Sequence, residues 1–163
     1  MYSMKRKTVK IILWFAVALW MAVIFAFSAQ NAENSTNTSD GVVDRVVEDM
    51  FGTADRDAVP DSVRLTVSFI VRKIAHFASY FILGVLCAGA FLSDKRRLLI
   101  TNLYALGLCF FYAVSDEVHQ LFVPGRAGRL LDVGIDTAGA MCGILIFAAV
   151  CAVLSRVRRN RKA

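Results

Sequence analysis

Cysteine is missing from the polar segments of this 163-residue sequence, and no two cysteines are spaced as CxxC. Cys87, Cys109, Cys142 and Cys151 all lie within apolar runs, where cysteine behaves as a small core residue. This distribution excludes a disulfide framework and a cysteine-based zinc site. An HExxH motif is missing too, so no spacing in the sequence is specific for a metal.

The sequence also lacks a basic patch on a folded surface, although its formal net charge is +6. Its Lys and Arg residues gather at the ends of apolar runs, which argues against a nucleic-acid partner. Apolar residues make up 57% of the chain, and the mean hydropathy is +0.56. A water-facing surface cannot be built from so apolar a chain, so we expect a membrane protein.

Long runs with little charge predict an all-α, membrane-embedded bundle of four transmembrane helices. The spans are expected at about residues 11–29, 74–92, 98–120 and 133–154. A cleaved signal peptide is the alternative for the first run. It is disfavoured because a signal peptide has a shorter apolar core, of about 7–15 residues, and because Phe27 does not suit a small-residue cleavage site. We treat residues 1–163 as a single membrane domain.

The first two spans are joined by an external loop at about residues 30–72. Residues 30–40 are rich in Asn, Ser and Thr, a composition typical of a solvated loop. From Val42 to Phe51 apolar residues recur at helical spacing, and Gly52 follows. This pattern predicts a short amphipathic helix that either covers the bundle or lies on the membrane surface. At residues 60–62, Pro-Asp-Ser predicts the start of a helix that could continue without a break into the second span.

The distribution of charge predicts how the bundle is oriented, because four crossings place both termini on one side. Of the 19 Lys and Arg residues, 12 lie in the two terminal tails and the 95–97 connection, whereas only Asp94 of the 13 acidic residues lies there. The positive-inside rule therefore predicts cytoplasmic termini in a multi-pass protein. Polar residues at the other helix ends then share one outer rim, at about the depth of the lipid headgroups.

Two polar islands at this rim contain most of the reactive side chains. The candidate catalytic residues are Lys73, His76, Asp116, Glu117, His119, Arg126, Asp132 and Asp136. Lys73, His76 and Tyr80 are spaced by three and four residues, so they lie along one helical face. The same spacing lets Asp116 with His119 or Gln120, and Asp132 with Asp136, point into one cavity.

These residue types suit chemistry on an anion. Arg126 follows a turn predicted at Pro124 and Gly125, and its guanidinium is a fork suited to a carboxylate or phosphate oxygen. Lys73 offers a second anion contact. The histidines and carboxylates suit acid–base catalysis or, together, a divalent metal, so the cofactor is left unknown. A membrane-embedded hydrolase or transferase is one interpretation, although the spacing identifies no nucleophile.

The alternative is a structural network of ion pairs in a non-catalytic binding or assembly protein. In that network Lys73 or Arg126 pairs with Asp132, and Arg129 pairs with Glu117, which locks three helices together. A transporter is a third interpretation, disfavoured because the sequence shows no inverted repeat. Two smaller expectations concern packing. The hydroxyl of Tyr80 should be satisfied within a packed interface, and the GxxxG at residues 139–143 permits close helix contact.

Three motifs in order resemble the VanZ-like family of small bacterial integral membrane proteins. They are KIAHFASYFILG at residues 73–84, SDEVHQLFVPGR at 115–126 and DVGIDTAG at 132–139, and FSAQ at 27–30 is similar to the family's first motif. The resemblance covers nearly the whole chain except residues 31–62. It implies a bacterial cytoplasmic membrane protein and, because the family is named for a member associated with low-level teicoplanin resistance, a link to glycopeptide resistance. It does not imply a reaction.

The residues and the resemblance together lead to one expectation. The protein should act at the outer face of the membrane on an anionic component of the cell envelope, such as a lipid-linked phosphate or a peptidoglycan precursor. Membrane lipids are its other expected partners.

Overall fold

The structure, a computed structural model, describes residues 2–29, 32–52, 59–92, 98–124, 126 and 128–161, without the side chains of residues 2–6 and 32–40. Five α-helices make up these residues: α1 Tyr2–Ser28, α2 Ala32–Phe51, α3 Asp61–Leu92, α4 Leu98–Gln120 and α5 Leu130–Asn160. The described residues contain no strand. The predicted all-α class is therefore confirmed.

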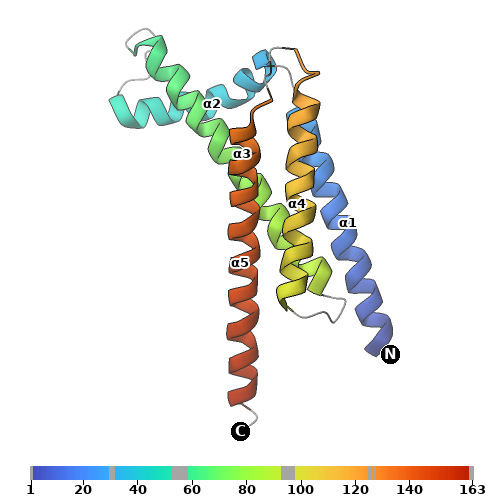
Figure 1. The fold of residues 1–163 in the computed structure, drawn as a ribbon. Coiled ribbons are helices and arrows are strands. Elements are labelled where there is room, and N and C mark those ends of the chain that lie inside the picture. Colours follow the sequence, from blue (N-terminus) through green and yellow to red (C-terminus); the bar gives the residue numbers. More distant parts are fainter. Residues whose placement is uncertain are drawn as a thin grey trace.

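Four of the helices, α1, α3, α4 and α5, are long and apolar enough to cross a membrane. Their outward surfaces carry large apolar side chains, among them Phe15, which is 69% exposed, and Leu99 and Phe111, both 71% exposed. Such a surface is unfavourable in water but suits hydrocarbon. The chain is a multi-pass membrane protein, and Figure 1 shows that α1 begins and α5 ends at the same end of the bundle.

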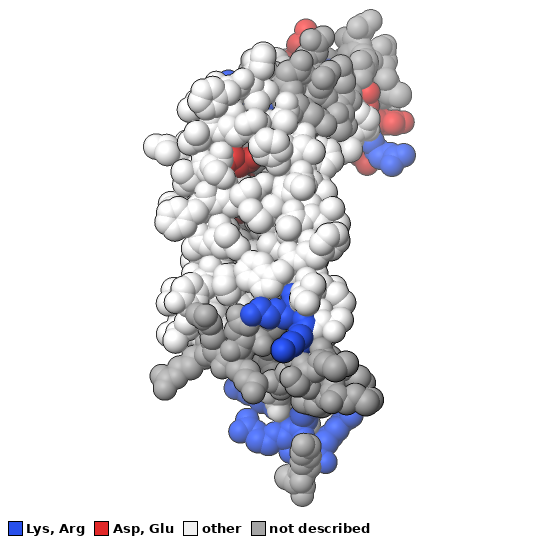
Figure 2. All heavy atoms as spheres, turned by 90° about the vertical axis from the view of Figure 1, so that its right-hand side faces the viewer, with Lys and Arg blue, Asp and Glu red and all other residues white. Residues whose placement is uncertain are grey.

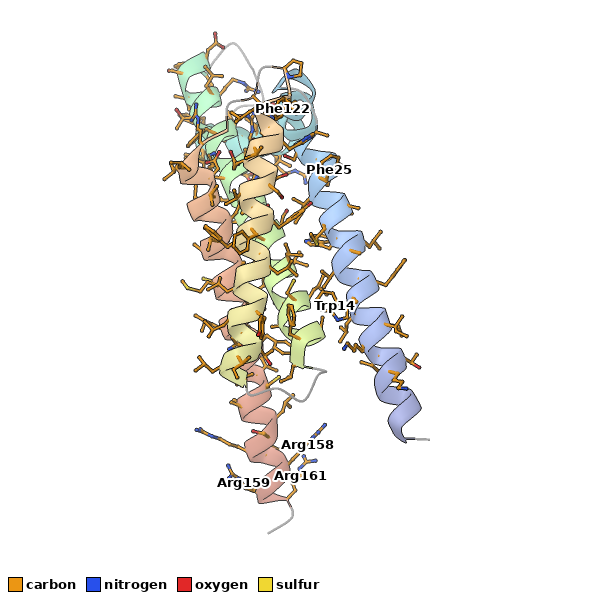
Figure 3. All side chains as sticks on the ribbon, turned by 45° about the vertical axis from the view of Figure 1, so that its right-hand side comes forward. Trp14, Phe25, Phe122, Arg158, Arg159 and Arg161 are labelled. Atoms are coloured by element: carbon orange, nitrogen blue, oxygen red, sulfur yellow. The ribbon has the colours of Figure 1, made fainter. Side chains whose placement is uncertain are left out.

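Two helices are longer than a bilayer of about 40–45 Å, headgroups included. The predicted start at Pro60 is confirmed, because α3 runs for 32 residues from Asp61 to Leu92. At about 1.5 Å per residue it is about 48 Å long, against about 30 Å of hydrocarbon, so its first turns project beyond the core. The other long helix, α5, projects in the opposite direction, and its last turns carry Arg158 and Arg159, with Arg161 just beyond (Figure 3).

The prediction of a loop at residues 30–40 is wrong, because α2 begins at Ala32 and includes residues 32–40. Asn, Ser and Thr disfavour a helix by only tenths of a kcal/mol per residue, and α2 is anchored by Val43 and Val47, which are buried against Val67 of α3. An ion pair between Asp44 and Arg64 adds to this contact. The amphipathic part of α2 therefore covers the projecting turns of α3 (Figure 1).

The predicted end of a helix at Gly52 and the predicted turn after α4 are both found where the structure describes them. Gly52 adopts φ +70°, and its N–H donates to the carbonyl of Glu48 at 2.8 Å, which closes α2. After α4, the Arg126 N–H donates to the carbonyl of Val123 at 3.1 Å, as the predicted turn requires. The type of that turn depends on Gly125, which lies outside the described residues, as does the basic connection at 93–97.

The most extensive helix contact is between α3 and α5, and glycines allow it. A Cβ added to Gly139 would overlap the carbonyl oxygen of Phe77, and one added to Gly143 would overlap that of Phe81. From the other side, a Cβ on Gly84 would overlap the backbone of α5. The GxxxG prediction is confirmed, because two backbones can approach this closely only where no side chain separates them.

Small side chains fill much of the remaining interior together with the fully buried Tyr80 and Leu83, and hydrogen bonds attach α1 to it. The fully buried small residues include Cys87, Ala88, Ala105, Cys109 and Ala140, which confirms that these two cysteines are core residues. Trp20 Nε1–H donates to the carbonyl of Ser79 at 2.9 Å, and the Tyr112 hydroxyl donates to that of Met21 at 2.6 Å. These bonds hold α1 against α3 and α4.

Candidate functional site

Buried polar residues gather at the end of the bundle opposite the basic tail of α5, and we call this region the polar end. Its buried polar side chains are Ser28, Ser68, Asp116, Glu117, Gln120, Asp132 and Asp136. Figure 2 shows the basic residues concentrated near one end, whereas carboxylate atoms are visible toward the other in a small recess among uncharged side chains. A group of carboxylates within spanning helices is costly unless each is paired or has a function.

Two side chains of α3 face two aspartates of α5. Lys73 forms an ion pair with Asp132, and one turn further along, His76 Nδ1 lies 3.5 Å from Asp136 Oδ1. The two helices run in the same direction, so residues three apart on α3 match residues four apart on α5. The predicted polar face of α3 is therefore found, and it faces α5.

From α4, two carboxylates enter the same region. The Asp116 carboxylate is 2% exposed, and its Oδ2 accepts a hydrogen bond from Gln120 Nε2 at 3.4 Å. The Glu117 Oε2 accepts one from the backbone N–H of Arg129 at 2.7 Å. Each carboxylate has one further oxygen, Asp116 Oδ1 and Glu117 Oε1, that is buried without a hydrogen-bond partner among the described residues.

His119 does not join these carboxylates. Its ring lies against the Phe25 ring of α1, with centroids 4.5 Å apart, and Phe25 extends from α1 toward α4 (Figure 3). Of the two partners that the sequence allowed for Asp116, the structure therefore selects Gln120. The reason is geometric. Around the axis of α4, a residue four positions after Asp116 is rotated from it by about 40°, whereas a residue three positions after it is rotated by about 60° in the opposite direction. His119 is therefore on the side of α4 that faces α1.

Three side chains from three helices converge most closely. Each of His76, Asp116 and Asp136 offers a donor atom, and these atoms lie within 4.8 Å of one another. Asp136 is completely buried, and neither of its carboxylate oxygens has a hydrogen-bond partner among the described residues. We call this group the His76 cluster. It is the group of described residues whose donor atoms are close enough to share one cation.

Arg126 lies close enough to the carboxylates for their charges to act on it, and Arg72 lies near Arg126. Burial lowers the pKa of the Arg126 guanidinium from its ordinary value, and the positive charge of Arg72 acts in the same direction. The carboxylates of Asp116, Glu117 and Asp132 raise it. An arginine keeps its charge through shifts of this kind, so the polar end combines two guanidinium groups with several buried acids.

The structural network foreseen as an alternative accounts for part of the polar end. The Lys73–Asp132 pair is present, and Glu117 is bound by Arg129 through the backbone N–H instead of the guanidinium. The side chain of Arg129 is not used in that bond. The network leaves the His76 cluster unexplained, because among the described residues neither oxygen of Asp136 has a hydrogen-bond partner and only the His76 imidazole faces it, at 3.5 Å.

The expectation for Tyr80 is wrong in one respect. Its side chain is fully buried and packs 6.2 Å from the ring of Tyr112, centroid to centroid, as a core residue would. Its hydroxyl, however, has no hydrogen-bond partner among the described residues. The hydroxyl faces the same buried region as the carboxylates of Asp116 and Asp136, whose charges act on it.

Sequence reasoning missed Ser28 and Arg72. Ser28, at the end of α1, is 2% exposed and its hydroxyl lies near the Asp116 carboxylate. It was visible only as part of the FSAQ motif, because a single serine at the end of an apolar run carries little signal. Arg72 directly precedes Lys73, and its position beside Arg126 depends on how α3 is rotated, which the spacing did not determine.

An apolar groove runs between α4 and α5 on the neighbouring face. It encloses about 520 Å³ and is lined by Phe110, Val114, Leu130, Val133, Gly134, Thr137, Ala138 and Met141. Its residues Val133 and Thr137 each follow directly on an aspartate of the polar end in α5. The groove therefore begins at the depth of the carboxylates and continues toward the middle of the bundle.

Comparison with known proteins gives one match. Residues 13–153 match a family model described as VanZ/LLP1, a range that includes every candidate residue named above. No curated protein and no solved structure matches the chain.

Proposed function

Because the chain belongs to the VanZ/LLP1 family, we propose that it acts at the outer face of the bacterial cytoplasmic membrane on an anionic component of the cell envelope. The substrate class is a lipid-linked phosphate or a peptidoglycan precursor. The observation that carries this proposal is the convergence of buried acids and a histidine from three spanning helices, with two arginines close by. Ionisable groups inside a membrane protein are expensive and usually mark a substrate or ion site.

The depth of the polar end fits a lipid headgroup. His76 lies 16 residues before the end of α3, and Asp116 lies 18 residues after the start of α4. At about 1.5 Å per residue these are axial distances of about 24 and 27 Å, close to the thickness of the hydrocarbon core. Lipid phosphates lie just beyond that boundary. The basic tails at the opposite end favour a cytoplasmic location for that end by the positive-inside rule.

The charges assign separate roles to the basic residues. Lys73 is neutralised by Asp132, so it orients that carboxylate and is a weaker candidate for the anion. Arg126 and Arg72 lie close enough for their charges to act on each other, and two neighbouring guanidinium groups suit an anion with several oxygens. Asp116 and Glu117, whose charges act on Arg126, would then be near the bound group, where they could transfer protons in a hydrolase or transferase.

The groove between α4 and α5 supports a substrate with a hydrocarbon chain. Its lining is apolar, and it starts at the level of the carboxylates. A lipid whose phosphate lay at the polar end could place its chain there. Modification or capture of such a precursor would also connect the protein with glycopeptide resistance, because teicoplanin acts on the cell envelope.

Binding of a polyprenyl phosphate to the purified protein in nanodiscs tests the proposal. Native mass spectrometry should show binding of the phosphate but not of the matching polyprenol, and Arg126→Gln should weaken it at least about 10-fold, the loss expected for a charge-assisted contact. Arg158→Gln, on the exposed tail of α5, is the matched control. Equal binding of the phosphate and the alcohol would contradict the proposal.

Product analysis in the same preparation separates an enzyme from a binding protein. Release of phosphate, or a new lipid-linked product, would make the polar end an active site. Binding without conversion would favour the alternative of a non-catalytic binding or assembly protein.

A further inference from the structure

We infer that the His76 cluster is a binding site for a single divalent transition-metal ion, Zn²⁺ or Mn²⁺. The first support is the donor set, one imidazole nitrogen and carboxylate oxygens from two aspartates, His76, Asp116 and Asp136. Carboxylates suit Mn²⁺ and imidazole suits Zn²⁺, and both ions accept this mixture. The three donors come from α3, α4 and α5, so one ion would connect the three helices.

The distances fit a metal centre. Two ligands that bind a tetrahedral metal at about 2.1 Å are about 3.4 Å apart. His76 Nδ1 and Asp136 Oδ1 are separated by 3.5 Å, a distance that is long for a hydrogen bond but matches this edge. The donor atom of Asp116 lies within 4.8 Å of the others, so a rotamer adjustment of about 1 Å would complete the triangle.

Burial supplies an independent reason. Asp136 is fully buried and both its oxygens lack hydrogen-bond partners among the described residues, while Asp116 keeps one such oxygen. Of the other carboxylates nearby, Asp132 is paired with Lys73. Glu117 accepts the Arg129 N–H and, like Asp116, keeps one buried oxygen without a partner, but its atoms are not among the donors that converge with His76. The nearest partner of Asp136 is the His76 imidazole at 3.5 Å, which leaves a buried carboxylate in a membrane bundle only weakly compensated and therefore unfavourable. A divalent ion would bind the carboxylate oxygens that have no hydrogen-bond partner among the described residues.

Three protein ligands leave a coordination position open, as in catalytic metal sites and unlike closed structural ones. An open position could take a water molecule or a phosphate oxygen. The role of the ion in handling an anionic substrate rests on the proposed function, whereas binding of the ion does not. A metal test without lipid therefore separates the two proposals.

The test is metal binding by the full-length protein in detergent after removal of metal with a chelator. One equivalent of Mn²⁺ should bind, detected by electron paramagnetic resonance, and Zn²⁺ should compete with it. At about 100 times its Kd the ion should raise the unfolding temperature by about 5–10 °C. Asp136→Asn should lower the affinity at least about 100-fold. Glu117→Gln, which also removes a buried acid but no cluster donor, should change it less than about threefold.

Two outcomes would overturn the inference. One is wild-type protein that binds neither ion below millimolar concentration and unfolds at the same temperature with and without a chelator. The other is loss of the ion to the same extent in Glu117→Gln and Asp136→Asn, which would mean diffuse attraction to acids. Should Asp136→Asn fail to elute as a folded protein, His76→Gln replaces it with the same expected loss.

Discussion

The contact between α3 and α5 differs between its middle and its polar end. In the middle, Gly139 and Gly143 pack directly against the backbone of α3 at Phe77 and Phe81, with no side chain between the two helices. At the polar end the same helices face each other through Lys73 with Asp132 and His76 with Asp136. The glycine contact holds the two helices together by close packing. The polar end leaves buried carboxylate oxygens without hydrogen-bond partners. We therefore regard the glycine contact as the structural part of the interface and the polar end as the part that binds a ligand.

The largest effect is expected from a side chain introduced into the middle. In Gly143→Leu the Cβ alone overlaps the carbonyl of Phe81, and a backbone cannot move aside as a side chain can. We expect a loss of more than about 3 kcal/mol, at the upper limit of overpacking, measured by thermal unfolding in detergent. Gly107→Leu on α4 is the control, because a Cβ there meets nothing within 4 Å. Equal losses in both variants would contradict the close contact.

A smaller effect is expected where the charges of the polar end are already paired. Lys73→Met leaves Asp132, with an 11% exposed side chain, without its cation, and should cost about 3 kcal/mol. Lys73→Met combined with Asp132→Leu should recover stability to within about 1 kcal/mol of wild type, because an apolar pair can replace a buried ion pair. A double variant as unstable as the sum of the two single variants would show that the residues act separately.

The smallest effect concerns the attachment of α1 to the polar end. Phe25→Ala removes the ring that packs on His119 and should cost about 1 kcal/mol in unfolding free energy. Phe27→Ala, two residues away and 57% exposed, should cost almost nothing when measured in the same detergent. A larger loss at Phe27 would mean that α1 is rotated relative to this description.

The spanning helices could be predicted because an apolar run of this length has few stable structures other than a transmembrane helix. The predicted ends of α4 agree with the structure to the residue. The start of α2 could not. The composition of its polar first half is typical of a loop. The helix is anchored by the contact of Val43 and Val47 with α3, which joins residues that are distant in sequence. In the basic tails the helices also extend past the predicted spans, since α1 begins at Tyr2 and α5 ends at Asn160. Charge ends a membrane span without ending a helix.

For the candidate site, helical spacing predicts which residues share a face of one helix, but it does not predict their partners on the other helices. That Lys73 and His76 share a face follows from helical geometry alone. That they pair with Asp132 and Asp136 in register depends on the glycine contact, which fixes how far α3 slides along α5. Spacing alone groups His119 with the acids. In the structure its ring packs on Phe25 of α1, and the spacing within α4 does not show where α1 lies. Metal binding and catalysis by these residues stay predictions.

The most direct test of the central claim, that the unsatisfied acids are the functional centre, is made in cells. Lipid-linked and cell-wall precursors are compared among cells without the protein, cells with wild-type protein, and cells with Asp136→Asn at the same membrane abundance. The account predicts that wild-type protein changes the amount of a phosphorylated precursor and that Asp136→Asn does not. The same change with Asp136→Asn as with wild type would contradict it.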